Sequence, residues 1–103
     1  MSGHVLHHVG SQLTKLACTF PPYTASYVAL REVVLYVRSF RRKPGGERYQ
    51  ATARMRDYAL DCLRFACKHN DDYELARAWA FAIGLHFLHL AGQVGAEVAV
   101  MPW

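Results

Sequence analysis

Polar residues mark one side of the chain between residues 47 and 68, where they recur at alternating steps of three and four. This spacing is typical of the solvent-facing stripe of an α-helix, since residues three and four apart share a face. The residues between them make a broad apolar face: Ala51, Met55, Tyr58, Cys62, Phe65 and Ala66. The pattern predicts an amphipathic helix over residues 47–69. On its polar stripe, Asp57 and Asp61 stand at helical spacing from Arg54 and Arg64 and are expected to form weak ion pairs.

A second helix is predicted over residues 26–42, with an apolar stripe and a basic line on different faces. The apolar stripe consists of Tyr27, Leu30, Val33, Val34, Val37 and Phe40, and the basic line of Arg31, Leu35, Arg38 and Arg42. Pro21-Pro22 prevents helix before this stretch, and Thr24 or Ser26 can cap it. Pro44-Gly45-Gly46 ends it. We therefore expect residues 43–46 to turn this helix back on the next one as an antiparallel pair.

A third helix is predicted over residues 72–91 and is apolar nearly all round. Its start carries a capping pattern, in which Asp71 or Asp72 caps the helix and Glu74 follows three positions after Asp71. From residue 75 to 91 the ionisable side chains are few: Arg77, His86 and His89. Such a helix lies inside a bundle, against a partner or in a membrane, and its length and small residues favour the first two. Gly92 and Gly95 are expected to end it.

The N-terminal residues give a weaker helical signal. Val5, Val9, Leu13 and Leu16 recur at helical spacing, but Gly3 and Gly10 lower helix propensity. We therefore expect residues 1–24 to form a short segment beside three main helices. At 103 residues the chain has room for a single domain. The predicted fold class is an all-α antiparallel bundle of three main helices with a short N-terminal segment, forming one domain over residues 1–103.

The charge of the chain is unevenly distributed. The net charge is +4 and the isoelectric point about 9.2, and all eight acidic residues lie at or after Glu32. An acid-free N-terminus is compatible with a mitochondrial targeting segment, although the arginines typical of such segments are missing. Hydrophobic residues make up 52% of the chain and charged residues 19%, so some apolar surface is expected to contact a partner. We expect a mitochondrial location, with the cytoplasm as the alternative.

Residues with catalytic or metal-binding chemistry are present but poorly arranged. His4, His7, His8 and Cys18 match no established zinc spacing, and His86 and His89 have no nearby carboxylate to orient them. The three cysteines include no Cys-x-x-Cys pair, and Cys62 and Cys67 point to different sides of one helix, so free thiols in a reducing compartment are expected. The sequence has no Gly-rich phosphate loop. These observations argue against an enzyme and predict neither catalytic residues nor a metal site.

The strongest binding signal is the run of cations at the end of the second predicted helix: Arg31, Arg38, Arg41, Arg42 and Lys43. Arginine guanidinium groups suit carboxylates and phosphates alike, so an acidic protein and RNA are both candidate partners. A solvated helix C-terminus would carry the same charges, because cations there interact favourably with the helix dipole. The sequence leaves these alternatives open.

The segment "REVVLYVRSFRR" resembles the opening helix of LYR-motif proteins, small three-helix mitochondrial factors that serve in respiratory-complex and iron-sulfur assembly. Leu35-Tyr36 lies on a first helix, Arg38 follows after an intervening valine, and Phe40 and Arg41 come next. The next helix bears "RYQATARMRDYALDCLRF", where Phe65 corresponds to the phenylalanine downstream of the family's motif. The resemblance covers residues 29–90.

This resemblance implies an acyl carrier protein as partner. An acidic helix of the carrier would meet Arg38, Arg41 and Arg42. The acylated phosphopantetheine arm of the carrier would enter the apolar bundle between the helices, so the chain itself would bind no cofactor directly.

We expect a non-enzymatic small helical adaptor or accessory subunit of a larger assembly that binds an acidic protein partner. The residues expected to bind it are Arg31, Leu35, Tyr36, Arg38, Arg41, Arg42 and Lys43. One alternative is an RNA-binding component of a ribonucleoprotein, in which Tyr36, Phe40 and Tyr49 would stack on bases. The other is a membrane-associated subunit that uses residues 75–91.

Overall fold

The part of the chain that the structure describes forms four long helices and one short one. The computed structural model describes residues 3–40, 43 and 45–99. The helices are α1 (Gly3–Ala17), α2 (Ala25–Ser39), α3 (Gly45–His69), α4 (Asp72–Leu90) and α5 (Ala96–Ala99), and the described residues contain no strand. The all-α fold is confirmed.

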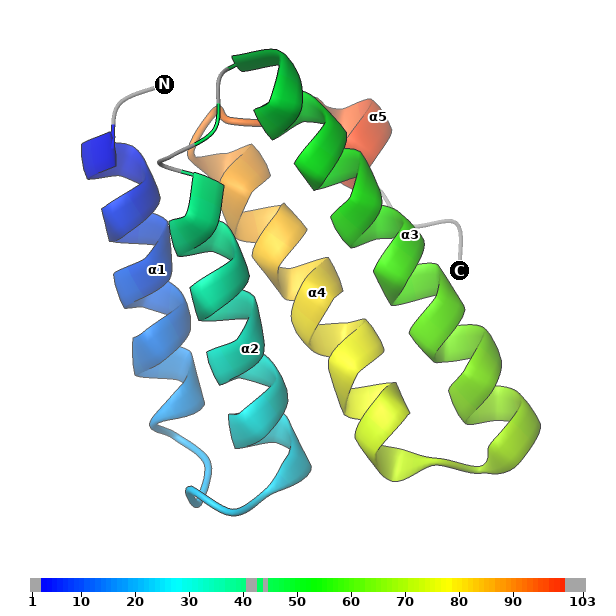
Figure 1. Cartoon of the computed structure of the whole chain (residues 1–103). Helices are drawn as coiled ribbons and strands as arrows, with labels where there is room; N and C mark the ends of the chain where they lie inside the picture. The colour runs from blue at the N-terminus through cyan, green and yellow to red at the C-terminus, as the bar shows by residue number, and fades with distance from the viewer. Residues whose placement is uncertain (1–2, 41–42, 44, 100–103) are drawn as a thin grey trace.

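The prediction of three main helices with a short N-terminal segment is wrong. α1 has 15 residues, as many as α2, and it packs along α2 (Figure 1). Four of its side chains are completely buried: Leu6, Val9, Leu13 and Ala17. Burial of this stripe outweighs the low helix propensity of Gly10, because each large buried aliphatic side chain contributes roughly 1.5–3 kcal/mol.

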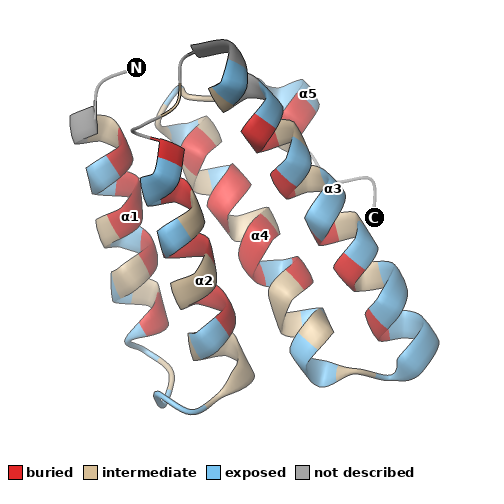
Figure 2. Ribbon diagram, in the orientation of Figure 1, coloured by how far each residue is buried: buried red, intermediate tan, exposed pale blue. Residues whose placement is uncertain are grey.

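α4 occupies the centre of the fold. It packs against both α2 and α3, whereas α2 and α3 make few backbone contacts with each other. In Figure 1, α2 and α4 run in the same direction and α3 runs the opposite way. Figure 2 shows that the buried residues of α2, α3 and α4 lie where these helices face one another. α2 and α3 are therefore antiparallel, as predicted, but both pack against α4 and make few contacts with each other.

Close helix approach explains the small residues of α4. A Cβ added to Gly84 would lie 2.6 Å from Val33 Cγ1 of α2 and 3.1 Å from Met55 Cε of α3. Val33 and Met55 are completely buried. Only a residue without a side chain fits where α4 is pressed between these two helices.

The predicted caps at Thr24 and Asp71 are confirmed, whereas α2 already ends at Ser39, and Gly45 and Gly46, expected in the turn, belong to α3. The Thr24 hydroxyl accepts a hydrogen bond from the Tyr27 backbone N–H at the start of α2, and Asp71 accepts one from the Glu74 N–H at the start of α4. Gly92 adopts a left-handed φ of 74° and ends α4. Asn70 does the same after α3 with a φ of 52°, and the Asp71 N–H donates to the Ala66 carbonyl there.

Candidate functional site

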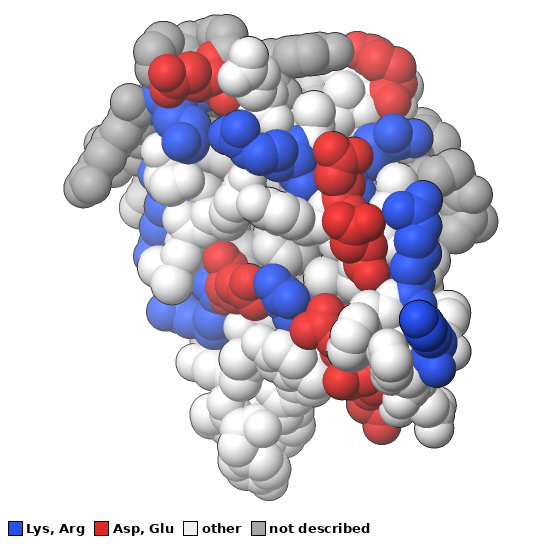
Figure 3. All heavy atoms as spheres, turned by 45° about the vertical axis from the view of Figure 1, so that its right-hand side comes forward, with Lys and Arg blue, Asp and Glu red and all other residues white. Residues whose placement is uncertain are grey.

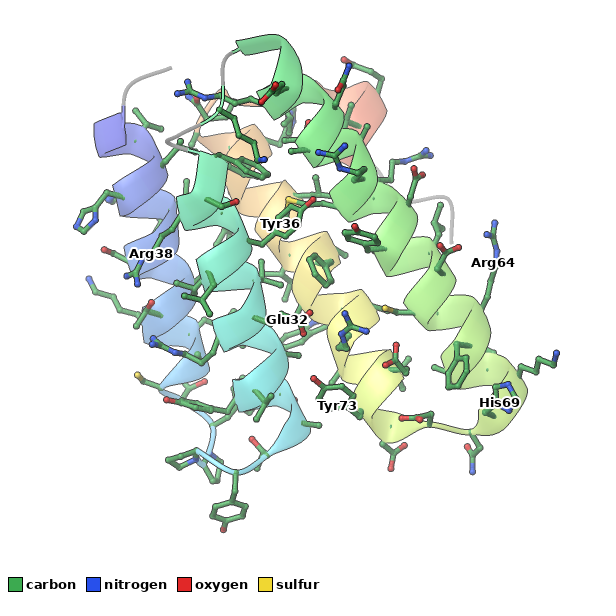
Figure 4. All side chains as sticks on the ribbon, in the orientation of Figure 1. Glu32, Tyr36, Arg38, Arg64, His69 and Tyr73 are labelled. Carbon is green, nitrogen blue, oxygen red and sulfur yellow. The ribbon has the colours of Figure 1, made fainter. Side chains whose placement is uncertain are left out.

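The basic line predicted from the sequence lies on the outer side of α2. Leu35 is 65% exposed at the position opposite the buried stripe, and Arg38 is exposed on the side that faces α1. Figure 4 shows Arg38 between α1 and α2. The close approach of Arg38 to Gly10 agrees with this placement, since a Cβ on that glycine would lie 3.4 Å from Arg38 Nε.

This side of the molecule has positive charge without nearby carboxylates. We define the basic face as Lys15 of α1 with Arg31 and Arg38 of α2. α1 contains no acidic residue, and neither Arg31 nor Arg38 forms an ion pair among the residues that the structure describes. An unpaired, partly exposed guanidinium retains its full capacity to bind a carboxylate or a phosphate.

The remaining predicted binding residues do not all join the basic face. Lys43 is half-buried in the bend after α2, and its backbone N–H donates a hydrogen bond to the Phe40 carbonyl. Arg41 and Arg42 lie outside the described residues. Arg48 of α3 also contacts the C-terminal end of α2, because its Nε donates a hydrogen bond to the same Phe40 carbonyl at 2.9 Å.

Tyr36 points away from the basic face, into the space between α2, α3 and α4. Its ring makes edge contacts with Phe40, Tyr58 and Phe81 at centroid distances of 5.4–6.0 Å. Its hydroxyl donates to the Ala51 carbonyl at 3.4 Å. Phe40 is completely buried, so its ring is enclosed rather than available to a nucleic-acid base.

An ion-pair cluster that the sequence reasoning missed joins α2 to α4. Arg77 donates to both oxygens of Glu32, from Nη2 at 2.8 Å and from Nε at 3.1 Å, and its Nη1 contacts Glu74 at 3.2 Å. The hydrogen bonds that Arg77 donates to Glu32 raise the pKa of Arg77 above its usual range. The sequence did hold a signal for this pair. Glu32 is the first acidic residue of the chain, and Arg77 is the only Arg or Lys between residues 75 and 91.

A cleft of about 420 Å³ lies beside this cluster, between α3 and α4. It is lined by Tyr58, Asp61, Cys62, Phe65, Glu74 and Arg77. Burial and a hydrogen bond to Glu74 raise the pKa of the Cys62 thiol to about 11. The thiol therefore stays protonated near neutral pH and is a weak nucleophile.

The other cysteines and the histidines take ordinary positions. Cys18 and Cys67 are exposed, and all three thiols are free. His89 Nδ1 lies 3.0 Å from the Val94 carbonyl, while His86 is exposed. The described residues contain no group of three or more side chains able to hold a metal ion. The side chain of His4 lies outside the described part of the chain.

Other charged residues of α3 and α4 are mostly intermixed in sign. Figure 3 shows acidic and basic side chains side by side on this part of the surface. The predicted pair of Asp61 with Arg64 forms at 3.3 Å, with side chains 71% and 75% exposed. Such a solvated pair contributes little to stability. α1 differs from these helices because it carries Lys15 and no acidic residue.

No protein-family model, curated protein or solved structure matches this chain. Within the part of the chain that the structure describes, no helix combines the length and apolar character needed to cross a membrane.

Proposed function

We propose that this chain is a non-enzymatic helical adaptor, an accessory subunit that binds an acidic protein through the outer side of α2. The observation that carries the proposal is the contrast between the arginines of α2 and α4. Arg77 contacts two carboxylates, whereas Arg31 and Arg38 contact none within the described residues. Both guanidinium groups are therefore free to bind the carboxylates of an acidic partner.

The surroundings of Arg38 support a protein partner. Its stem lies over Gly10, where the absent side chain leaves room for the guanidinium to lie low on the surface. Leu35, one turn earlier, presents a large exposed apolar side chain beside it. An apolar centre with arginines at its edge is the composition of protein–protein contact surfaces. In this proposal Arg41, Arg42 and Lys43, which follow α2 in the sequence, also contribute positive charge to binding, and Tyr36 fixes the spacing of α2 and α3 from inside.

The resemblance to LYR-motif proteins makes an acyl carrier protein the first partner to test. Carrier proteins in their apo, phosphopantetheinyl and acylated forms would separate two contributions. Binding of all three forms with equal affinity would indicate recognition of the acidic helix alone. Tighter binding of the acylated form would indicate that the acyl arm also enters the bundle. A mitochondrial location is part of this proposal and can be checked by fractionation.

Affinity purification from the native cells, followed by native mass spectrometry, tests the proposal. We expect an acidic protein to copurify with the unmodified chain and with Arg64→Glu, and to be lost with Arg38→Glu. Arg64 is the control because it is also exposed but is already paired with Asp61. Nuclease-sensitive RNA in place of a protein would favour the ribonucleoprotein alternative. Equal recovery with both variants would refute the role of Arg38.

A further inference from the structure

Another pocket lies at the end of the bundle where α2 and α4 both begin, which is the lower end in Figure 1. Its volume is about 520 Å³, and it is lined by Phe20, Ser26, Asp72, Leu75, Ala76 and Trp79. Pockets of this size that combine apolar walls with a few polar groups are typical small-molecule sites. None of the lining residues belongs to the surface proposed for the acidic partner, so this pocket is a separate site.

The walls of the pocket are aromatic and aliphatic. Phe20, in the connection between α1 and α2, meets Trp79 of α4 edge to face, with ring centroids 5.9 Å apart and ring planes at 83°. The two rings therefore form walls at nearly a right angle. Leu75, one turn before Trp79, is 50% exposed, and Trp79 is 38% exposed. These side chains present apolar area to solvent, and an apolar ligand would be stabilised by covering it.

Two polar side chains of the pocket have no partner among the residues that the structure describes. The Asp72 carboxylate forms neither an ion pair nor a hydrogen bond there, and the Ser26 hydroxyl forms no hydrogen bond. The neighbouring Asp71 is engaged, because its carboxylate accepts the Glu74 N–H. No Lys or Arg lines the pocket. A carboxylate accepts hydrogen bonds and a hydroxyl can do so as well, so the two groups suit a ligand with several N–H donors.

The position of Asp72 favours a cation at the rim of the pocket and an apolar chain inside it. Asp72 and Trp79 are seven residues apart on one face of α4, so about 10 Å of helix separates them, with Leu75 between. Asp72 is exposed, so an ammonium bound to it stays partly hydrated and avoids the cost of a buried charge. A chain that extends from this rim past Leu75 to Trp79 would bury its methylene groups while its charged end remains in water.

We propose that this pocket binds a primary ammonium group carried on an unbranched apolar chain. The ammonium donates hydrogen bonds to the Asp72 carboxylate and the Ser26 hydroxyl, and the chain packs against the apolar walls. A primary ammonium has three N–H donors and no acceptor, which matches these two groups, whereas a carboxylate ligand would meet the charge of Asp72. A long-chain amine and the lysine side chain of a peptide both present this chemistry. The site goes beyond the adaptor function proposed above.

Fluorescence titration of Trp79 with three ligands that differ only in their head group tests the site: octylamine, octanol and octanoate. The chain has two tryptophans, so a Trp103→Phe parent leaves Trp79 as the only indole. We expect octylamine to bind roughly tenfold or more tightly than octanol, because its ammonium makes a charge-assisted hydrogen bond, and octanoate to bind most weakly. Helix N-termini attract anions, so tighter binding of octanoate would show that the helix dipoles outweigh Asp72 and would overturn the proposal. Equal binding of all three ligands, or no binding of octylamine, would overturn it too.

Two variants of the same parent locate the binding site of the ammonium. Asp72→Asn should weaken octylamine binding roughly tenfold or more and leave octanol binding unchanged, since it removes the charge and keeps the shape of the side chain. Asp57→Asn is the matched control, because Asp57 is also exposed but lies on α3 outside the pocket. Octylamine affinity that is the same in both variants would refute the role of Asp72, and far-UV circular dichroism verifies that each variant is folded.

A further titration distinguishes the two sources of the ammonium. Nα-acetyl-lysine amide that binds as tightly as octylamine would identify a lysine side chain as the ligand, whereas much weaker binding would identify a free long-chain amine. No acidic protein is present in these titrations, so their results stand apart from those for the adaptor function.

Discussion

Gly84 and Gly10 allow the packing of α4 to be measured with one kind of substitution. Both glycines lie inside long helices, so replacement by alanine removes the same backbone entropy penalty of about 1 kcal/mol at each position. The two sites differ in what the new methyl group meets. The difference in unfolding free energy between the two variants therefore isolates the packing term.

At Gly84 the new Cβ would lie 2.6 Å from Val33 Cγ1, well inside van der Waals contact, and both Val33 and Met55 are completely buried. Overpacking of this kind costs about 1–3 kcal/mol. At Gly10 the nearest atoms are 3.4 and 3.6 Å away and belong to the flexible, exposed side chain of Arg38. We expect Gly10→Ala to be more stable than wild type and Gly84→Ala to be about 1–3 kcal/mol less stable than Gly10→Ala.

Urea denaturation followed by far-UV circular dichroism measures both variants directly. For a domain of this size, 1 kcal/mol corresponds to a shift of roughly 4–8 °C in Tm, so thermal melts give an independent check. The measurements should be made at equal protein concentration, since any self-association would change apparent stability. If the two variants were equally stable, the close approach of α4 to α2 would be refuted.

Other substitutions test individual contacts. Glu32→Gln should lower the free energy of unfolding by about 1 kcal/mol in denaturant titrations, because it weakens the bidentate contact with Arg77, whereas Asp61→Asn should leave it almost unchanged. Asp71→Ala should cost about 1 kcal/mol through loss of the α4 cap, measured by the shift in urea midpoint. Iodoacetamide at pH 8 should alkylate the two exposed thiols well before Cys62, as peptide mass spectrometry can show. Between pH 9 and 11 the wild-type chain should lose stability relative to Cys62→Ala, since the unfolded chain releases the thiol proton first.

Local signals in the sequence predicted α2, α3 and α4 but not the short α5. The buried stripe of α2 was read correctly because its apolar residues repeat at helical spacing, and five of the six are completely buried. The caps at Thr24 and Asp71 were readable because they depend on residues only three positions apart. The same periodicity predicted that Leu35 and Arg38 are exposed and that Arg31 lies outside the buried stripe.

The sequence could not predict what depends on contacts between distant segments. Gly10 lowered the expected helicity of α1, yet the burial of Leu6 and Val9 against the rest of the core decides the outcome. Periodicity shows which face of a helix is apolar but not which neighbour covers it, so the position of α4 between α2 and α3 was not readable. The contact of Glu32 with Arg77 joins residues 45 positions apart and was missed for the same reason.

Tyr36 shows how the same limit affects the candidate site. Its place in a recognisable motif suggested a surface role, but position 36 turns toward the α3–α4 side of the helix. There its ring meets Tyr58 and Phe81, which are encoded 22 and 45 residues later. The sequence predicted that this helix carries binding residues, and the tertiary contacts determine which of those side chains reach the surface.

The central position of α4 has a consequence for the synthesis of this protein. A ribosome completes α1, α2 and α3 before α4, so the apolar stripes of three helices emerge before the helix that covers α2 and α3. Productive folding has to wait for contacts that span some 45 residues, such as that of Glu32 with Arg77. Nascent chains that stop before residue 72 should therefore remain unfolded, aggregate readily and depend on chaperones.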